Sequence, residues 1–163
     1  MKLRYLIGDA TEPILKPAII CHVVNTIGAW GAGFVIPLGK KYPDAKNRYL
    51  QLKPALHLKQ TQIINFSNDV SIANMVAQEG IYKAKDGTLP IRYDALKKCL
   101  EDVQSVAFAK GATVAMPRIG AGLAGGSWGK IEQIIKDTMR VDTYVYTLDS
   151  EKDNWKGTDY ENS

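Results

Sequence analysis

Residues 112–123 read Ala-Thr-Val-Ala-Met-Pro-Arg-Ile-Gly-Ala-Gly-Leu, a short apolar run followed directly by a glycine-rich segment. The apolar run predicts a buried strand over 112–116. A helical pattern follows from Trp128 to Met139. Glycines placed between a strand and a helix let backbone N–H groups approach an anion closely, and the helix adds the positive end of its dipole. This stretch therefore predicts an anion-binding loop.

The same order of elements occurs nearer the N-terminus. Residues 18–24 read Ala-Ile-Ile-Cys-His-Val-Val, and a glycine-rich segment over 28–33 and a helical pattern over 34–41 follow. Pro37 lies inside that pattern, so the helix must begin late or be kinked. One glycine-rich loop is explained by a tight turn alone. Two such loops after two buried strands favour a shared ligand site at the carboxyl edge of a sheet.

The remaining elements define the fold class. Further strands are expected over 3–7, 59–66, 70–76 and 142–148, and further helices over 44–52 and 93–110. A hairpin turn at Asn68-Asp69 joins two of these strands, while strands and helices alternate in the second half of the chain. The pattern predicts a three-layer α/β/α sandwich with a central mixed β-sheet.

The composition favours one ordinary globular domain. The chain has 163 residues and is 45% hydrophobic. Neither a signal peptide nor a run of membrane-spanning length is recognisable, so we expect a cytoplasmic protein. Cys21 and Cys99 have no metal-binding spacing and are interpreted as buried thiols. No metal or cofactor is implied, and neither loop ends in the Gly-Lys-Ser/Thr of a P-loop.

Charge is distributed unevenly. Residues 149–163 hold five acids and two bases, so the rest of the chain holds 19 bases and 12 acids, a net charge of +7. A basic body suits an anionic ligand such as a nucleotide, although solubility alone would also explain it. Nucleic acid is not the expected partner, because no block of Lys and Arg is interleaved with aromatic residues.

Five short motifs together resemble the macrodomain family. They are Gly8-Asp9, His22-Val23-Val24-Asn25, Trp30-Gly31-Ala32-Gly33-Phe34, Tyr42-Pro43-Asp44-Ala45 and Met116-Pro117-Arg118-Ile119-Gly120-Ala121-Gly122-Leu123. The chain is most similar to the branch that contains ADP-ribose 1″-phosphate phosphatases and terminal ADP-ribose–protein glycohydrolases. The resemblance covers residues 1–148, which leaves 149–163 as a polar, flexible C-terminal tail.

The resemblance implies ADP-ribose or a derivative as ligand, with ADP-ribosylated macromolecules as further partners. Asp9 matches the residue that receives the adenine amino group, although it also suits a helix N-cap before residues 11–15. Asn25 matches the asparagine at the distal ribose. Arg118 suits a phosphate or a surface ion pair. The implied ligand-binding set is Gly8, Asp9, Ala10, Val23, Val24, Asn25, Trp30, Gly31, Ala32, Gly33, Phe34, Val35, Pro117, Arg118, Ile119, Gly120, Ala121, Gly122 and Leu123.

The two groups of relatives in this branch use different catalytic residues. The glycohydrolases use a lysine and an aspartate, and these positions are Gln78 and Ala124 here. A glutamine cannot form a covalent adduct with an opened ribose, and an alanine cannot carry a proton. The phosphatases carry a histidine three residues before the asparagine, as His22 precedes Asn25, which makes these two the candidate catalytic residues.

Three functions follow from this comparison. Removal of the terminal phosphate of ADP-ribose 1″-phosphate is the leading prediction. The alternatives are a non-catalytic ADP-ribose reader and a hydrolase of ADP-ribosyl-protein or O-acetyl-ADP-ribose. Against a catalytic His22 stands its place in an apolar strand, where strict alternation would put it on the face opposite Asn25.

Overall fold

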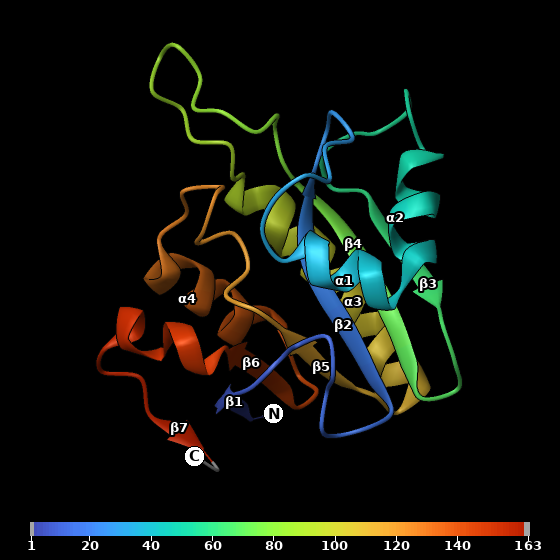
Figure 1. Ribbon diagram of the computed structural model, residues 1–163, viewed down its shortest axis with the longest axis vertical. Helices are drawn as coiled ribbons and strands as arrows, with labels where there is room; N and C mark the ends of the chain where they lie inside the picture. The colour runs from blue at the N-terminus through green and yellow to red at the C-terminus, as the bar shows by residue number, and fades with distance from the viewer. Residues whose placement is uncertain (1, 162–163) are drawn as a thin grey trace.

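The protein is built on one seven-stranded sheet, seen in a computed structural model that describes residues 2–161 (Figure 1). The strand order is β3-β4-β2-β5-β6-β1-β7. The antiparallel β3–β4 pair makes the sheet mixed, since all the other pairs are parallel. The strands are β1 (Leu3–Ile7), β2 (Ala18–Asn25), β3 (Thr61–Asn65), β4 (Val70–Gln78), β5 (Thr113–Met116), β6 (Thr143–Thr147) and β7 (Tyr160–Glu161).

Helices cover both faces of the sheet. They are α1 (Val35–Lys41), α2 (Pro43–Leu50), α3 (Tyr93–Lys110) and α4 (Trp128–Thr138), with a 3-10 helix η1 (Asp149–Trp155) after β6. The pair α1–α2 packs over one face, while α3 and α4 pack together over the other (Figure 1). The predicted three-layer α/β/α sandwich is therefore confirmed.

The central strands are apolar because both of their faces are covered. Along β2 the odd residues, such as Ile19 and Cys21, pack in the α3–α4 core, and the even residues Ile20 and Val24 pack in the α1–α2 core. The strand β4 is buried along its whole length. These two strands hold the first glycine-rich loop in place.

Two local features differ from the simplest expectation. Helix α1 begins at Val35, so Pro37 falls in its first turn, where a missing N–H costs no hydrogen bond and no kink is needed. In β2, the register to β4 shifts between Val24 and Asn25. The residue left unpaired is Ala77 of β4, and the Asn25 side chain lies on the α1–α2 face, where its Oδ1 accepts a hydrogen bond from the hydroxyl of Tyr49 (3.1 Å).

The C-terminal segment was predicted to be a flexible tail outside the domain, and the structure differs. Residues 149–155 form η1, and β7 pairs in parallel with β1, with Tyr5 opposite Tyr160. An ion pair between Arg4 and Glu161 joins the same two strands. The polar composition of the segment reflects its place at the edge of the sheet, because an edge strand keeps one side in water.

Candidate functional site

A cleft of about 1140 Å³ runs along the carboxyl ends of the parallel strands. The cleft has two ends, because β4 lies on one side of the central strands β2 and β5 and β1 lies on the other side. Gln78 and residues 81–83 line the end beside β4, and Asp9, Leu148 and Trp155 line the end beside β1 and β6. The two glycine-rich loops meet in the middle. The cleft is large enough for a ligand of dinucleotide size.

The predicted ligand-binding residues come together here with two exceptions. Trp30 and Ala121 do not line the cleft, whereas the rest of the predicted set does. The Trp30 indole is buried in the α1–α2 core, edge-on to the His22 ring at 5.4 Å and beside Tyr49. A large apolar ring gains more from that burial than from the loop surface, so Trp30 supports the loop from below.

The Asn25 side chain organises the first loop, which joins β2 to α1. Its Oδ1 accepts hydrogen bonds from the N–H groups of Ala29 (2.9 Å) and Ile27 (3.2 Å), and its Nδ2 donates to the carbonyl of Ala29 (2.9 Å). These bonds hold the turn that leads to Gly31. Asn25 therefore shapes the loop as well as lining the cleft.

The second loop, which joins β5 to α4, is held by close backbone packing. Gly120 has a φ of 70°, and a Cβ there would lie 2.9 Å from Ile91. The N–H of Gly126 donates to the carbonyl of Gly120, and a Cβ at Gly126 would lie 2.5 Å from that oxygen. By contrast, Gly31 in the first loop and Gly122 in the second have open space where a Cβ would be.

Both loops present backbone donors that the protein itself leaves free. Within residues 2–161, no backbone hydrogen bond uses the N–H groups of residues 31–34, or those of Gly120, Gly122 and Leu123. Successive free N–H groups form a concave site for an anion. Two such groups on opposite sides of one cleft suit a diphosphate.

Asp9 lies just beyond β1 at the edge of the cleft. Its Oδ1 accepts hydrogen bonds from the backbone N–H (2.9 Å) and the hydroxyl (2.8 Å) of Thr11. No helix forms over residues 11–15, so this is a local turn rather than the N-cap that the sequence also allowed. Oδ1 is engaged and Oδ2 remains as an acceptor for a ligand amino group.

His22 lines the cleft but is almost fully buried, between Trp30 and Phe34. Its Nε2 lies 2.5 Å from Oδ1 of Asn74, whose Nδ2 donates to the carbonyl of Ala45 and to Oε1 of Gln62. Since Asn74 Oδ1 must then accept, the network assigns the His22 proton to Nε2 and leaves a lone pair on Nδ1.

Burial lowers the pKa of His22 to about 4, against the smaller opposing effect of the Asn74 hydrogen bond. The imidazole is therefore neutral at pH 7. Its Nδ1 is buried and has no hydrogen-bond partner among the described residues. A neutral imidazole of this kind can accept a proton or a hydrogen bond, and it cannot donate a proton from Nδ1.

Arg118 makes contacts that the sequence did not indicate. Its guanidinium lies over three aromatic rings, at 4.5 Å from the ring centre of Trp155, 4.8 Å from Tyr5 and 5.1 Å from Trp128. Its Nη2 donates to the hydroxyl of Thr158 at 2.9 Å. Each cation–π contact contributes about 0.5–2 kcal/mol. Arg118 thus fastens the C-terminal segment to the second loop, a role different from both the phosphate contact and the surface ion pair that the sequence allowed.

Sequence reasoning missed part of the lining. Ile81, Tyr82 and Lys83 come from the long loop after β4, which extends away from the body of the molecule (Figure 1). Leu148, Glu151 and Trp155 come from the C-terminal segment. A tryptophan in an otherwise polar tail was the one signal in the sequence that pointed to docking on the domain.

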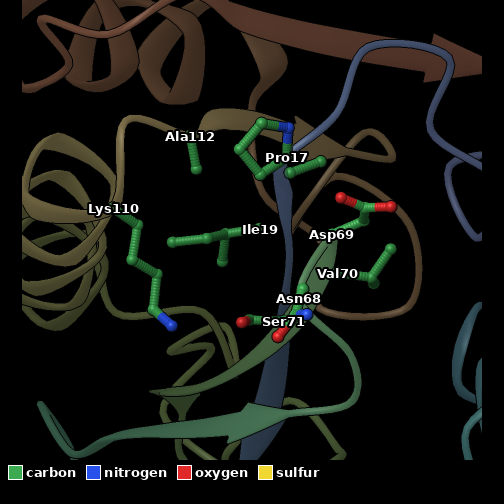
Figure 2. A pocket seen from close by; sticks show the side chains of 9 residues that line it. Pro17, Ile19, Asn68, Asp69, Val70, Ser71, Lys110 and Ala112 are labelled. Atoms are coloured by element: carbon green, nitrogen blue, oxygen red, sulfur yellow. The ribbon is translucent and has the colours of Figure 1, made fainter.

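A second cavity of about 140 Å³ lies at the amino ends of the parallel strands, opposite the cleft. Lys110 lies to one side of it and Asp69 to the other (Figure 2). It is too small for a nucleotide. No helix within residues 2–161 is long and apolar enough to cross a membrane. The same residues contain no group of three or more His, Cys, Asp or Glu side chains placed to hold a metal ion.

Known proteins share this fold. A solved structure of a protein of unknown function from Bacteroides thetaiotaomicron is 43% identical, with a TM-score of 0.87 over 91% of this chain and 99% of that one. A macrodomain protein from Streptomyces coelicolor is 32% identical, with a TM-score of 0.77 over 90% of this chain and 99% of that one. The fold and the loop-lined cleft are those of a macrodomain. The chain belongs to the macrodomain family.

Two curated relatives are also similar, although no family model matches the chain. The ADP-ribose 1″-phosphate phosphatase of Candida albicans is 26% identical, over 90% of this chain and 99% of that protein. The chromodomain-helicase-DNA-binding protein 1-like of Danio rerio is 30% identical, over 88% of this chain. The chain spans only 15% of the length of that second relative.

Proposed function

We propose that this chain binds ADP-ribose in the cleft. The adenine lies at the end beside β1, where Asp9 Oδ2 accepts a hydrogen bond from the amino group. The diphosphate lies between the two glycine-rich loops, and the distal ribose lies near Asn25 and Gln78. This order follows the order of the strands, because β1, β2 with β5, and β4 succeed one another across the sheet.

The free N–H groups of the two loops are the observation that carries the proposal. Residues 31–34 and Gly120, Gly122 and Leu123 present donors with no backbone partner within residues 2–161. An anion that accepted several of them would form charge-assisted hydrogen bonds, which are stronger than bonds between neutral groups. The basic body of the chain adds a favourable long-range field.

We further propose that the bound ligand can be ADP-ribose 1″-phosphate, hydrolysed at its terminal phosphate. A water oxygen attacks the phosphorus, the bond from phosphorus to the 1″ oxygen breaks, and ADP-ribose and inorganic phosphate leave. Similarity to the Candida albicans phosphatase over nearly its full length supports this reaction, as does the spacing of His22 and Asn25. A neutral His22 would contribute as a proton acceptor.

A non-catalytic reader is the second candidate, and a specific observation favours it. The positions that carry the glycohydrolase lysine and aspartate line the cleft as Gln78 and Ala124. His22 is 2% exposed, and its Nε2 is engaged with Asn74. A cleft with this lining can bind without turning over its ligand.

Two assays on the same preparation separate the candidates. Calorimetry measures ADP-ribose binding, and phosphate release is measured from ADP-ribose 1″-phosphate with wild type and His22→Ala. An enzyme that uses His22 as a base should lose about a hundredfold or more in turnover in the variant, and wild-type activity should fall only as pH approaches 4. Binding without phosphate release would establish a reader, and release that survives the substitution would exclude His22 as the base.

A further inference from the structure

The C-terminal segment forms one wall of the cleft. Leu148, Glu151 and Trp155 line the cleft at the end beside β1 and β6, which is also the end that Asp9 borders. The segment then continues to β7, which pairs with β1 at the edge of the sheet. The part of a nucleotide that meets this wall is therefore the part that meets Asp9.

One side chain of the second loop holds this wall. The Arg118 guanidinium stacks at 4.5 Å on Trp155, and its Nη2 donates to the hydroxyls of Thr158 (2.9 Å) and Tyr160 (3.4 Å). Its Nε donates to the hydroxyl of Thr147, at the end of β6. The half-buried Trp155 thus has one ring face against a cation and borders the cleft with the rest of the ring.

Arg118 also belongs to the glycine-rich loop at the centre of the cleft. Arg118 lies two residues before Gly120, in the loop whose free N–H groups suit a phosphate. Any shift of this loop therefore moves the group against which Trp155 stacks. Tyr5 and Trp128 complete the enclosure of the guanidinium, so its position is set by packing rather than by a ligand.

We propose that Arg118 is a positioning residue that acts through Trp155. It holds the C-terminal segment against the domain, and the segment supplies the flat apolar surface on which the base of a nucleotide packs. Selectivity for a purine base then depends on Arg118, although Arg118 need not touch the base. This inference rests on the proposed function, since it assigns a binding determinant to the same cleft.

Ligand-binding measurements test this role. Affinities for ADP-ribose, ADP and UDP are compared among wild type, Trp155→Ala, Arg118→Lys and the control Phe108→Ala. ADP and UDP share the diphosphate and differ in the base. Phe108 is an exposed aromatic residue of α3 that does not line the cleft. Trp155→Ala and Arg118→Lys should weaken ADP-ribose and ADP by about tenfold, the scale of one aromatic stacking contact, and weaken UDP less. The lysine keeps the charge but cannot stack and donate in the same geometry.

Amide hydrogen exchange supplies the structural readout in the full-length chain. Residues 149–161 should exchange faster in unliganded Arg118→Lys than in wild type, and ADP should slow their exchange in wild type. Equal losses of ADP and UDP in Arg118→Lys would show that Arg118 acts on the phosphates and would overturn the proposal. So would wild-type affinities in Trp155→Ala. A wild-type protein that binds none of the three ligands would overturn the proposed function and this inference together.

Discussion

The two ends of the cleft are equipped differently. Beside β1, Asp9 offers a free carboxylate oxygen, and Trp155 stands beside it in a segment fastened by Arg118. Beside β4, the lining contains Gln78 and Ala124, and the one nearby imidazole is buried and neutral. Under the proposed function, the first end recognises the base of the ligand. The second end holds the candidate base His22, together with Tyr82 and Lys83 from the loop after β4.

Substitutions in the middle of the cleft, between the two ends, should cause the largest loss of ligand affinity. Gly31→Val and Gly122→Val each put a side chain into open space beside the free N–H groups. Several charge-assisted hydrogen bonds would be lost together, so ADP-ribose affinity should fall by more than about a hundredfold. Calorimetry measures the affinity, and thermal unfolding should change little because no protein atom lies within 4 Å.

Gly129→Ala is the matched control for these variants. Gly129 is exposed on α4 and does not line the cleft, so both affinity and stability should be preserved. Gly33 and Gly120 are unsuitable for this test, since their φ values of 80° and 70° make any substitution a test of the backbone. Full ligand affinity in Gly122→Val would place the diphosphate elsewhere.

The second prediction concerns the environment of His22 at the far end. Its pKa is lower in the folded protein, about 4, than the value near 6.5 expected when it is unfolded. The unfolded chain therefore binds more protons between these values, and stability falls as pH drops from about 6.5 towards 4. The contribution to the free energy of unfolding is about 3 kcal/mol. It should be missing from the pH profile of His22→Gln, measured by denaturant unfolding.

Identical pH dependence in wild type and His22→Gln would show that the imidazole is not held neutral. His57 provides the control, because it is exposed and lies outside the cleft. His57→Gln should retain the fall in stability towards pH 4, because His22 is intact in that variant.

At the end of the cleft beside β1, Asp9→Asn should cause a smaller loss of ligand affinity. The amide keeps an oxygen for the turn at Thr11, but it puts an N–H₂ group where the ligand amino group needs an acceptor. Affinity for ADP-ribose and AMP should fall in parallel by about 1.5–3 kcal/mol. Thr11→Val, which removes only the hydroxyl contact to Asp9, should bind nearly as wild type. Unchanged affinity in a folded Asp9→Asn protein would remove Asp9 from the site.

The smallest effect should come from Gln78→Ala. Its Nε2 donates to the carbonyl of Gly80, so the side chain serves the loop after β4. Affinity for ADP-ribose should change by less than about threefold, because the hydrogen bond that is lost joins the side chain to its own loop and not to the ligand. A loss as large as that of Asp9→Asn would mean that the far end recognises the ligand as strongly as the base end does.

Much of this arrangement could be predicted from local sequence. The strand over 3–7 and the helix over 93–110 were placed at the observed residues, since each has a clear apolar period and a terminating glycine. Gly111 follows that helix in the left-handed conformation, which glycine adopts readily at a helix C-terminus. Most of the cleft lining followed from the two loops, because parallel strands bring their carboxyl ends together.

What could not be predicted depends on contacts between distant residues. Trp30 sits in a glycine-rich loop, and only the packing of α1 and α2 shows that its ring turns inward. A two-residue strand such as β7 has no periodicity of its own. The stacking of Arg118 on Trp155 joins positions 37 residues apart, and no local pattern encodes it.

Calorimetric titration of wild type and Gly122→Val with ADP-ribose tests the central claim most directly. The account predicts saturable one-to-one binding by wild type, weaker binding of AMP, which lacks the second phosphate and distal ribose, and no measurable binding by the variant. Failure of folded wild type to bind ADP-ribose, or equal binding by Gly122→Val, would contradict the claim that the two loops hold the diphosphate.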